Sequence, residues 1–327
     1  MIRILLTAIA CVALLFSSAN QAHAYPAYAQ AAYDNPREAT GKIVCANCHL
    51  AQKPTQLELP QAVTPGQVFK ATVKIPVDPS VQQPTGDGSY GALNVGAAVV
   101  LPEGFRMATP EEMGEELFAE TEEFYIQQYN DDHPNILVVG PIGSPEEQEI
   151  VFPVMAPDPA EDDSVAFMKY LVSAGGNRGR GQVNPDGSMT NNNAFKAATT
   201  GRVSAITEVA DPFSPPTDGP AARVDLSNYY SPVSIVTIDT AAGPVDEIVP
   251  AGPQLLVGIG DSVEEGTLIT SDPNVGGFGQ AEREIVLQNP TRVKWLIAFL
   301  ASVALAQIML VLKKKQIEKI QVAEGFV

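Results

Sequence analysis

A single Cys-x-x-Cys-His motif constrains this chain more than any other feature of its sequence. The motif comprises Cys45, Cys48 and His49, and it does not recur. Two thiols and an imidazole at this spacing are typical of covalently attached haem, with the thiols bonded to the haem vinyl groups and the imidazole as the proximal iron ligand. Helical spacing is needed to bring both thiols to adjacent haem edges, so the motif predicts a short helix and one covalently bound haem c.

The two cysteines taken alone fit other chemistry. In an exported protein they can form a disulfide, and Cys-x-x-Cys is also the spacing of a thiol-redox pair. The histidine that follows immediately favours haem over both. A β-rich adhesion or scaffold protein, with a disulfide at Cys45 and Cys48, is the contrasting function that this alternative would imply.

The N-terminal segment has the pattern of a secretory signal peptide. An early basic residue is followed by an apolar run over Ile4–Phe16, and small residues end the segment at Ala24. Residues 1–24 are therefore predicted to be removed, which makes Tyr25 the mature N-terminus. A lipoprotein anchored through Cys11 fits less well, because the apolar run continues past that cysteine.

Near the C-terminus, residues Trp295–Leu312 include no charged side chain. As a helix this stretch would span about 27 Å, close to the thickness of a bilayer's hydrocarbon core. A buried helix of a soluble protein would rarely be apolar on every face. We predict a transmembrane helix over 293–312. The lysines at 313–315 place the tail, residues 313–327, on the cytoplasmic side by the positive-inside rule.

The charge of the chain excludes one class of partner. Acidic residues outnumber basic ones by 38 to 20, for a formal charge of −18, which argues against nucleic acid. Many glutamates gather between Pro110 and Phe124, where they indicate a solvated helical face rather than a docking site.

Between its two ends the chain has the pattern of a mainly β protein. Short apolar or alternating runs recur, among them "VFKATVKIPV", "GAAVVLP", "NILVVGP", "VSIVTIDT" and "REIVLQ", and they are separated by many of the 27 prolines and 26 glycines. This predicts a β-sandwich or barrel. Besides the haem motif, one helix is predicted over "DNPREAT", with Asn35 as N-cap, Pro36 at the first position and Glu38 as the capping-box partner.

The second axial ligand of the iron decides what such a protein does. An open position suits a haem enzyme such as a peroxidase, whereas two strong ligands leave only electron transfer. The sequence leaves three kinds of ligand open. His133 lies in a polar turn that suits a surface residue. The free α-amine of Tyr25 would have a pKa near ~8, far below that of lysine. The methionine candidates are Met107, Met113, Met155, Met168 and Met189.

Longer stretches resemble one known family. They include "YPAYAQAAYDNPREATGKIVCANCHLAQKP", "GALNVGAAVVLPEGF", "NILVVGPIG", "GGNRGRGQV" and "DPNVGGFGQAEREIVLQNP", followed by the anchor "LASVALAQIMLVLKKKQ". Together they resemble the cytochrome f family, the c-type haem subunit of the cytochrome bf complex of oxygenic photosynthesis, over nearly the whole chain.

The resemblance implies a role for individual residues. Cys45 and Cys48 would bind the haem, His49 would be the proximal ligand, and Tyr25 would ligate the iron through its α-amine. It also implies a chain of buried waters lined by Gln83, Asn177, Arg180, Gln182 and Asn192.

The same resemblance implies a fold and a place in photosynthesis. The fold would be an elongated β-sandwich large domain (25–192 and 274–291) with a small β domain resembling a hybrid motif (193–273). The chain would accept electrons from the Rieske iron–sulfur protein and pass them to plastocyanin or a soluble c-type cytochrome. Its haem domain would face the thylakoid lumen. It would be no enzyme on its own, but a subunit of a plastoquinol–plastocyanin reductase beside a cytochrome b subunit.

Some positions depart from the plant members of the family. The stretches "QQPTGDGSYG" and "SAITEVADPF" lack the lysines that attract acidic plastocyanin in plants. An aromatic residue near the haem is replaced by Asn184, and Tyr28 follows the N-terminal Tyr-Pro-x. The small-domain loop is also longer than in plants. The missing lysines and the longer loop indicate a cyanobacterial chain and argue against plant-like electrostatic docking, whereas Asn184 and Tyr28 bear on the redox potential.

Overall fold

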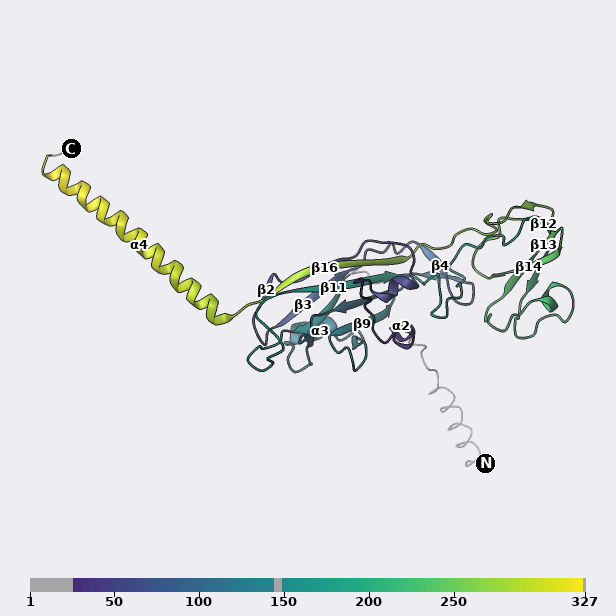
Figure 1. Ribbon diagram of the computed structural model, residues 1–327, viewed down its shortest axis with the longest axis horizontal. Helices are drawn as coiled ribbons and strands as arrows, with labels where there is room; N and C mark the ends of the chain where they lie inside the picture. Colours follow the sequence, from purple (N-terminus) through teal and green to yellow (C-terminus); the bar gives the residue numbers. More distant parts are fainter. Residues whose placement is uncertain (1–25, 144–148, 326–327) are drawn as a thin grey trace, which may run out of the picture.

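The computed structural model describes residues 26–143 and 149–325. The predicted signal peptide and Tyr25 lie outside the described residues. Within them the chain is mainly β, with one long C-terminal helix, as the sequence predicts. The molecule is elongated: two packed sheets form its middle, another sheet lies at one end, and the C-terminal helix projects from the other end (Figure 1).

Two sheets pack face to face as a β-sandwich. All neighbouring strands in them run antiparallel except β2 and β16, which are parallel. The smaller sheet has the order β1 (Gln56–Glu58), β3 (Val68–Lys74), β10 (Glu149–Met155), β7 (Arg106–Met107). The larger sheet has the order β2 (Ala62–Val63), β16 (Gly277–Leu287), β11 (Lys169–Arg178), β6 (Val95–Val100), β9 (Ile136–Ile142), β8 (Gln127–Gln128).

Strand β6 shows how this sandwich creates a second packing surface. Every residue of β6 is buried. Val99 points into the main core between the sheets, while Ala98 and Val100 belong to a smaller cluster with Ile43 and Phe278. Since alternate side chains of a strand point to opposite faces, the larger sheet is covered on both. The haem motif packs on the outer face.

A third sheet forms the end of the molecule away from the C-terminal helix (Figure 1). It has its own apolar clusters and lies within the range predicted as the small domain; the domain boundaries themselves remain predictions. A two-stranded ribbon of β4 (Gln82–Pro84) and β5 (Tyr90–Ala92) lies between this sheet and the sandwich. The order of the third sheet is β14 (Gly243–Pro250), β13 (Val233–Thr240), β12 (Gly201–Val209), β15 (Ser262–Val263).

The short helices agree with the sequence only in part. Helix α3 (Glu115–Thr121) lies within the acidic stretch predicted to be helical, and a 3-10 turn, η2, spans Pro220–Arg223. The helix predicted over 34–40 is wrong. Asn35 accepts a hydrogen bond from the backbone of Arg37 (2.9 Å), as an N-cap would, but Arg37 then pairs with Ile43 in an isolated β-bridge. The chain turns back instead of continuing as a helix.

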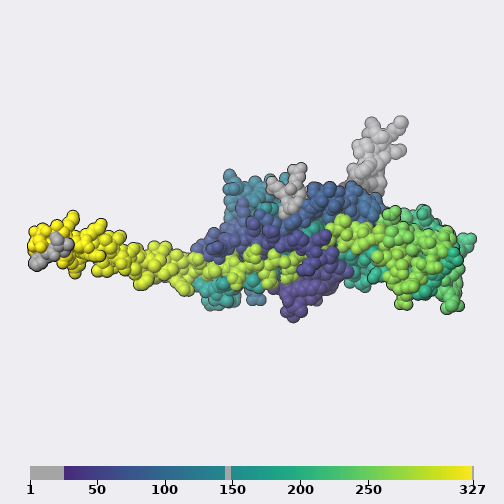
Figure 2. Space-filling model, turned by 90° about the horizontal axis from the view of Figure 1, so that it is seen from above, coloured from purple at the N-terminus to yellow at the C-terminus, as the bar shows by residue number. Residues whose placement is uncertain are grey.

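The C-terminal helix α4 runs over Pro290–Ala323. It begins where the Asn289 side chain accepts hydrogen bonds from the backbone N–H groups of Thr291 (2.9 Å) and Arg292 (3.1 Å), a true N-cap. None of its residues is buried, and its apolar window is fully exposed. By length and composition α4 is a candidate membrane span, and it contains the predicted segment 293–312. Figure 2 shows it extending well beyond the β body.

Ending the chain after Asn289 should release the protein from the membrane. The truncation removes α4 and no buried side chain, so the remaining sheets should fold and hold haem as before. Fractionation of cells expressing both forms, followed by staining for covalent haem, measures this. A chain ended after Gln316 keeps the whole apolar stretch and should stay with the membrane; release of both forms, or of neither, would contradict the role given to α4.

Candidate functional site

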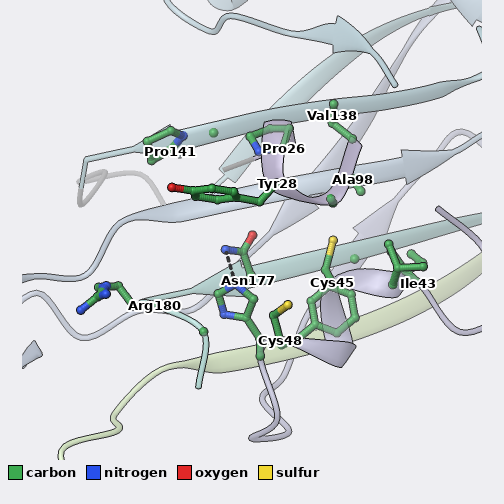
Figure 3. Close-up of a pocket in the computed structure, with 18 of the residues that line it drawn as sticks. Pro26, Tyr28, Ile43, Cys45, Cys48, Ala98, Val138, Pro141, Asn177 and Arg180 are labelled. Carbon is green, nitrogen blue, oxygen red and sulfur yellow. Dashed lines mark hydrogen bonds between the residues drawn. The ribbon is translucent and has the colours of Figure 1, made fainter. Parts of the chain in front are cut away.

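The haem motif forms one tight turn. The 3-10 helix η1 spans Val44–Asn47, and the backbone carbonyl of Cys45 accepts hydrogen bonds from the N–H groups of Cys48 (3.3 Å) and His49 (3.0 Å). The predicted short helix is thus confirmed as a single 3-10 turn. This turn brings both cysteine side chains to the same side, where they border one cavity (Figure 3).

The cavity measures about 430 Å³ and lies against the outer face of the larger sheet. That volume is within the range of cofactor and ligand sites. One wall is the haem motif, and the opposite wall is the N-terminal helix α2 (Pro26–Ala32). The sheet contributes mainly small and apolar residues. Among them are Gly96, Ala98, Val138, Gly175, Asn177 and Phe278.

His49 is buried in a state that suits a metal ligand. Its Nε2 lies 3.5 Å from the side-chain nitrogen of Asn177, and its Nδ1 is buried without a hydrogen-bond partner. Burial lowers the pKa of His49 to about 4. At neutral pH the imidazole is therefore uncharged and has a lone pair to donate, as metal binding requires. An orphaned buried nitrogen is costly unless something completes its contacts.

Within the described residues Cys45 and Cys48 are free thiols, with no disulfide between them. Burial raises the pKa of Cys45 to about 11, with the nearby Cys48 adding to the effect against a backbone hydrogen bond. Burial also raises the pKa of Cys48. Both side chains are thus protonated at neutral pH, and both border the space where a haem edge would lie.

Glycines keep this space open. A Cβ added at Gly96 would lie 2.7 Å from Oδ1 of Asn177, and one added at Gly175 would lie 2.4 Å from the ring of Phe278. At Gly181 a Cβ would come within 3.2 Å of the Cβ of Cys48. Side chains here would displace the residues that line the cavity. Thiols, an imidazole whose Nδ1 has no hydrogen-bond partner among the described residues, and a glycine-lined wall together fit a covalently bound haem.

The side chains considered as the second axial ligand lie away from the cavity. Within 26–143 and 149–325, no methionine lines the cavity, and neither does His133. Met168 and Met189 are about half exposed. Instead Pro26 and Tyr28 lie across the cavity from Asn177 and the cysteines (Figure 3). Tyr25, the remaining candidate, precedes Pro26 in the chain and lies outside the described residues.

The residues expected to line buried waters form a hydrogen-bonded group beside the motif. The backbone of Arg180 donates to Oε1 of Gln83 (2.7 Å). Gln182 donates from its backbone to the carbonyl of Cys48 (2.8 Å). The side chain of Asn192 donates to the carbonyl of Arg180 (2.8 Å), and its own oxygen is buried without a partner. Asn177 sits apart from this group, at His49. Their role toward water remains a prediction.

Two residues at the site, Asn191 and Tyr129, belong to no sequence motif and could not be identified from the sequence alone. The side chain of Asn191 donates to the carbonyls of Thr85 (2.8 Å) and Ala251 (2.7 Å), and accepts from Arg180. Tyr129 is buried at the cavity and contacts α2. Neither has a spacing rule relative to the cysteines. Helix α2 itself was detectable, since its sequence "PAYAQAA" has four alanines, the strongest helix former.

Comparison with known proteins places the chain in one family. A family model described as "Apocytochrome F, N-terminal" matches residues 25–179, and one described as "Apocytochrome F, C-terminal" matches residues 191–326. Cytochrome f of Synechococcus sp. strain JA-3-3Ab is 59% identical over 98% of both chains. Cytochrome f of Thermosynechococcus vestitus is 54% identical over 97% of this chain and 96% of its own. Both relatives are cyanobacterial. The chain therefore belongs to the cytochrome f family, the c-type haem subunits that carry electrons in the cytochrome bf complex.

Proposed function

We propose that this chain is a membrane-anchored carrier of single electrons, with its haem iron closed by two protein ligands. One observation carries the proposal: the motif and α2 enclose the same cavity from opposite sides. When bound, the haem supplies a one-electron iron couple. Cys45 and Cys48 would tether it, and the uncharged imidazole of His49 would donate to one face of the iron.

The α-amine of Tyr25 is proposed as the ligand on the other face. Tyr25 is bonded to Pro26, and Pro26 lines the cavity opposite the motif. No described methionine, and not His133, competes for that face. A free amine with a pKa near ~8 loses its proton far more readily than a lysine. The ligand would exist only after removal of residues 1–24, which links export of the chain to completion of the site.

Helix α4 and the lysines that follow its apolar stretch support an orientation of the chain in the membrane. The α4 helix would cross the thylakoid membrane once, with Lys313–Lys315 on the cytoplasmic side and the sheets in the lumen. There the chain would take electrons from the Rieske iron–sulfur protein, bound in the same complex beside the cytochrome b subunit. It would pass them to plastocyanin or to a soluble c-type cytochrome. Quinol oxidation belongs to the assembled complex, and this chain contributes transfer alone.

Rapid mixing tests the proposed transfer. The reduced protein is mixed with oxidised plastocyanin, and separately with an oxidised soluble c-type cytochrome, while haem absorbance is followed. We expect one-electron oxidation by at least one acceptor, with a rate constant of about 10⁵–10⁷ M⁻¹s⁻¹ or higher. Steady turnover of hydrogen peroxide, without oxidation by either acceptor, would instead establish a haem enzyme.

A further inference from the structure

Helix α2 forms one wall of the cavity, but its own residues do not account for its stability. It has seven residues, and none of them is buried. Isolated helices of this length do not persist in water. Ala29 makes partial apolar contact with the cluster on the outer face of the sheet, which is a small area. Contacts from elsewhere in the chain must therefore hold the helix in place.

Two adjacent residues, Tyr129 and Asn130, supply such contacts, and we call them the helix latch. The hydroxyl of Tyr129 lies 2.7 Å from the carbonyl oxygens of both Ala29 and Tyr33. The Asn130 side chain donates to the carbonyl of Asp34 (2.9 Å). The Ala29 carbonyl also accepts the backbone N–H of Tyr33 (2.9 Å), and the carbonyls of Tyr33 and Asp34 belong to the two residues that follow α2. The latch therefore holds the chain at the end of α2 that faces away from Pro26.

The connection also runs in the opposite direction. The side chain of Gln30, on α2, donates to the backbone carbonyl of Tyr129. Tyr129 is only 2% exposed, so each of these hydrogen bonds at its hydroxyl and carbonyl is shielded from water. Shielded polar groups that lose their partners pay the full desolvation cost. These hydrogen bonds therefore stabilise the docked position of α2, because undocking would leave the buried polar groups of Tyr129 without their partners.

The latch is itself fixed to the sheet under the cavity. The backbone N–H of Tyr129 donates to the carbonyl of Ile136 (2.8 Å), the first residue of β9. Strand β9 pairs with β6, and Val138 of β9 lines the cavity (Figure 3). The latch thus joins the wall that carries Pro26 to the sheet against which the motif packs.

We propose that Tyr129, assisted by Asn130, is a positioning residue that holds the chain's mature N-terminus at the second axial position of the haem iron. This inference rests on the proposed function, in which that terminus is the ligand. Tyr129 acts through α2. It fixes the helix, the helix fixes Pro26, and Pro26 is bonded to the ligand residue. Nothing in the sequence spacing signals the link, because Tyr129 is remote from the motif in the chain.

Replacing Tyr129 by phenylalanine tests the proposal, because it removes the hydroxyl and keeps the buried ring. The carbonyls of Ala29 in α2 and of Tyr33, which follows α2, then lose the hydroxyl that they share. The purified full-chain holoprotein is reduced and mixed with carbon monoxide, and the rate of complex formation is measured from haem absorbance. We expect about a five- to tenfold faster rate than in the unmodified protein, which corresponds to one hydrogen bond of ordinary net strength. Asn130→Ala should give a smaller increase.

The matched control is Tyr125→Phe. It makes the same chemical change in the same domain, but at a side chain that is 78% exposed, and it should leave the rate unchanged. If Tyr129→Phe lowers the unfolding temperature while neither latch variant changes the carbon monoxide rate, the latch only stabilises the fold and the inference is overturned. If the unmodified protein already binds carbon monoxide rapidly, the proposed function fails first, so the two failures are distinguishable.

Discussion

His49→Gly should abolish the low-spin spectrum of the haem and open the iron to carbon monoxide. The imidazole of His49 is uncharged, buried and without a partner at Nδ1, so its removal leaves one axial position empty and a hole beside the iron. Both cysteines remain to tether the haem. Absorption and electron paramagnetic resonance spectra of the purified protein measure the change. Free imidazole added to the variant should enter the hole and restore the low-spin spectrum.

His133→Ala is the matched control for this prediction. His133 lies outside the cavity, and its backbone N–H donates a hydrogen bond to Oδ1 of Asn130 (2.9 Å), which the substitution leaves in place. The control should keep the spectrum of the unmodified protein. If the low-spin spectrum survives in His49→Gly but is lost in His133→Ala, His133 is the proximal ligand and the role given to His49 is wrong.

Moving the mature N-terminus by one residue should have an effect nearly as large. Inserting a serine between Ala24 and Tyr25 keeps the predicted cleavage point and displaces the free amine from Tyr25 by about 3.8 Å along the chain. Because Pro26 and the latch residue Tyr129 hold α2 at the cavity, the new amine should not reach the iron in the same geometry. We expect a high-spin fraction and carbon monoxide binding, with the new N-terminus verified by mass spectrometry.

Tyr25→Phe separates the amine from the phenol. This variant changes the side chain and keeps the amine at the same place, so its low-spin spectrum should persist. If the low-spin spectrum is lost in Tyr25→Phe and retained after the serine insertion, the ligand is the side chain of Tyr25 and not its amine.

The strands could be predicted because their signals are local. The apolar run of β6 is one example: it contains three β-branched valines, and every residue of β6 is buried. The capping box at Asn35 and Glu38 was misleading for a physical reason. An N-cap stabilises a helix that other contacts already favour, but the following residues have no apolar face to bury. Glu38 instead donates its backbone N–H to Lys42 (2.9 Å), which closes a turn.

The site could be predicted only where it is contiguous in sequence. Cys45, Cys48 and His49 follow one motif, and the structure brings all three to one cavity. The opposite wall depends on tertiary contacts across about a hundred residues, such as the hydrogen bond from Tyr129 to Ala29. No periodicity encodes such a pairing. The absence of described methionines from the cavity lining likewise could not be read from the sequence, because their positions relative to the cavity are set by which strands pair.

Exposure of the unmodified holoprotein to carbon monoxide and cyanide tests the central claim most directly. The account predicts a six-coordinate, low-spin haem in both oxidation states, with only slow formation of a carbon monoxide complex by the reduced protein and no rapid cyanide complex of the oxidised protein at neutral pH. A high-spin spectrum with rapid binding of either ligand would mean that the iron has an open face, and would contradict a site closed by His49 and the N-terminus.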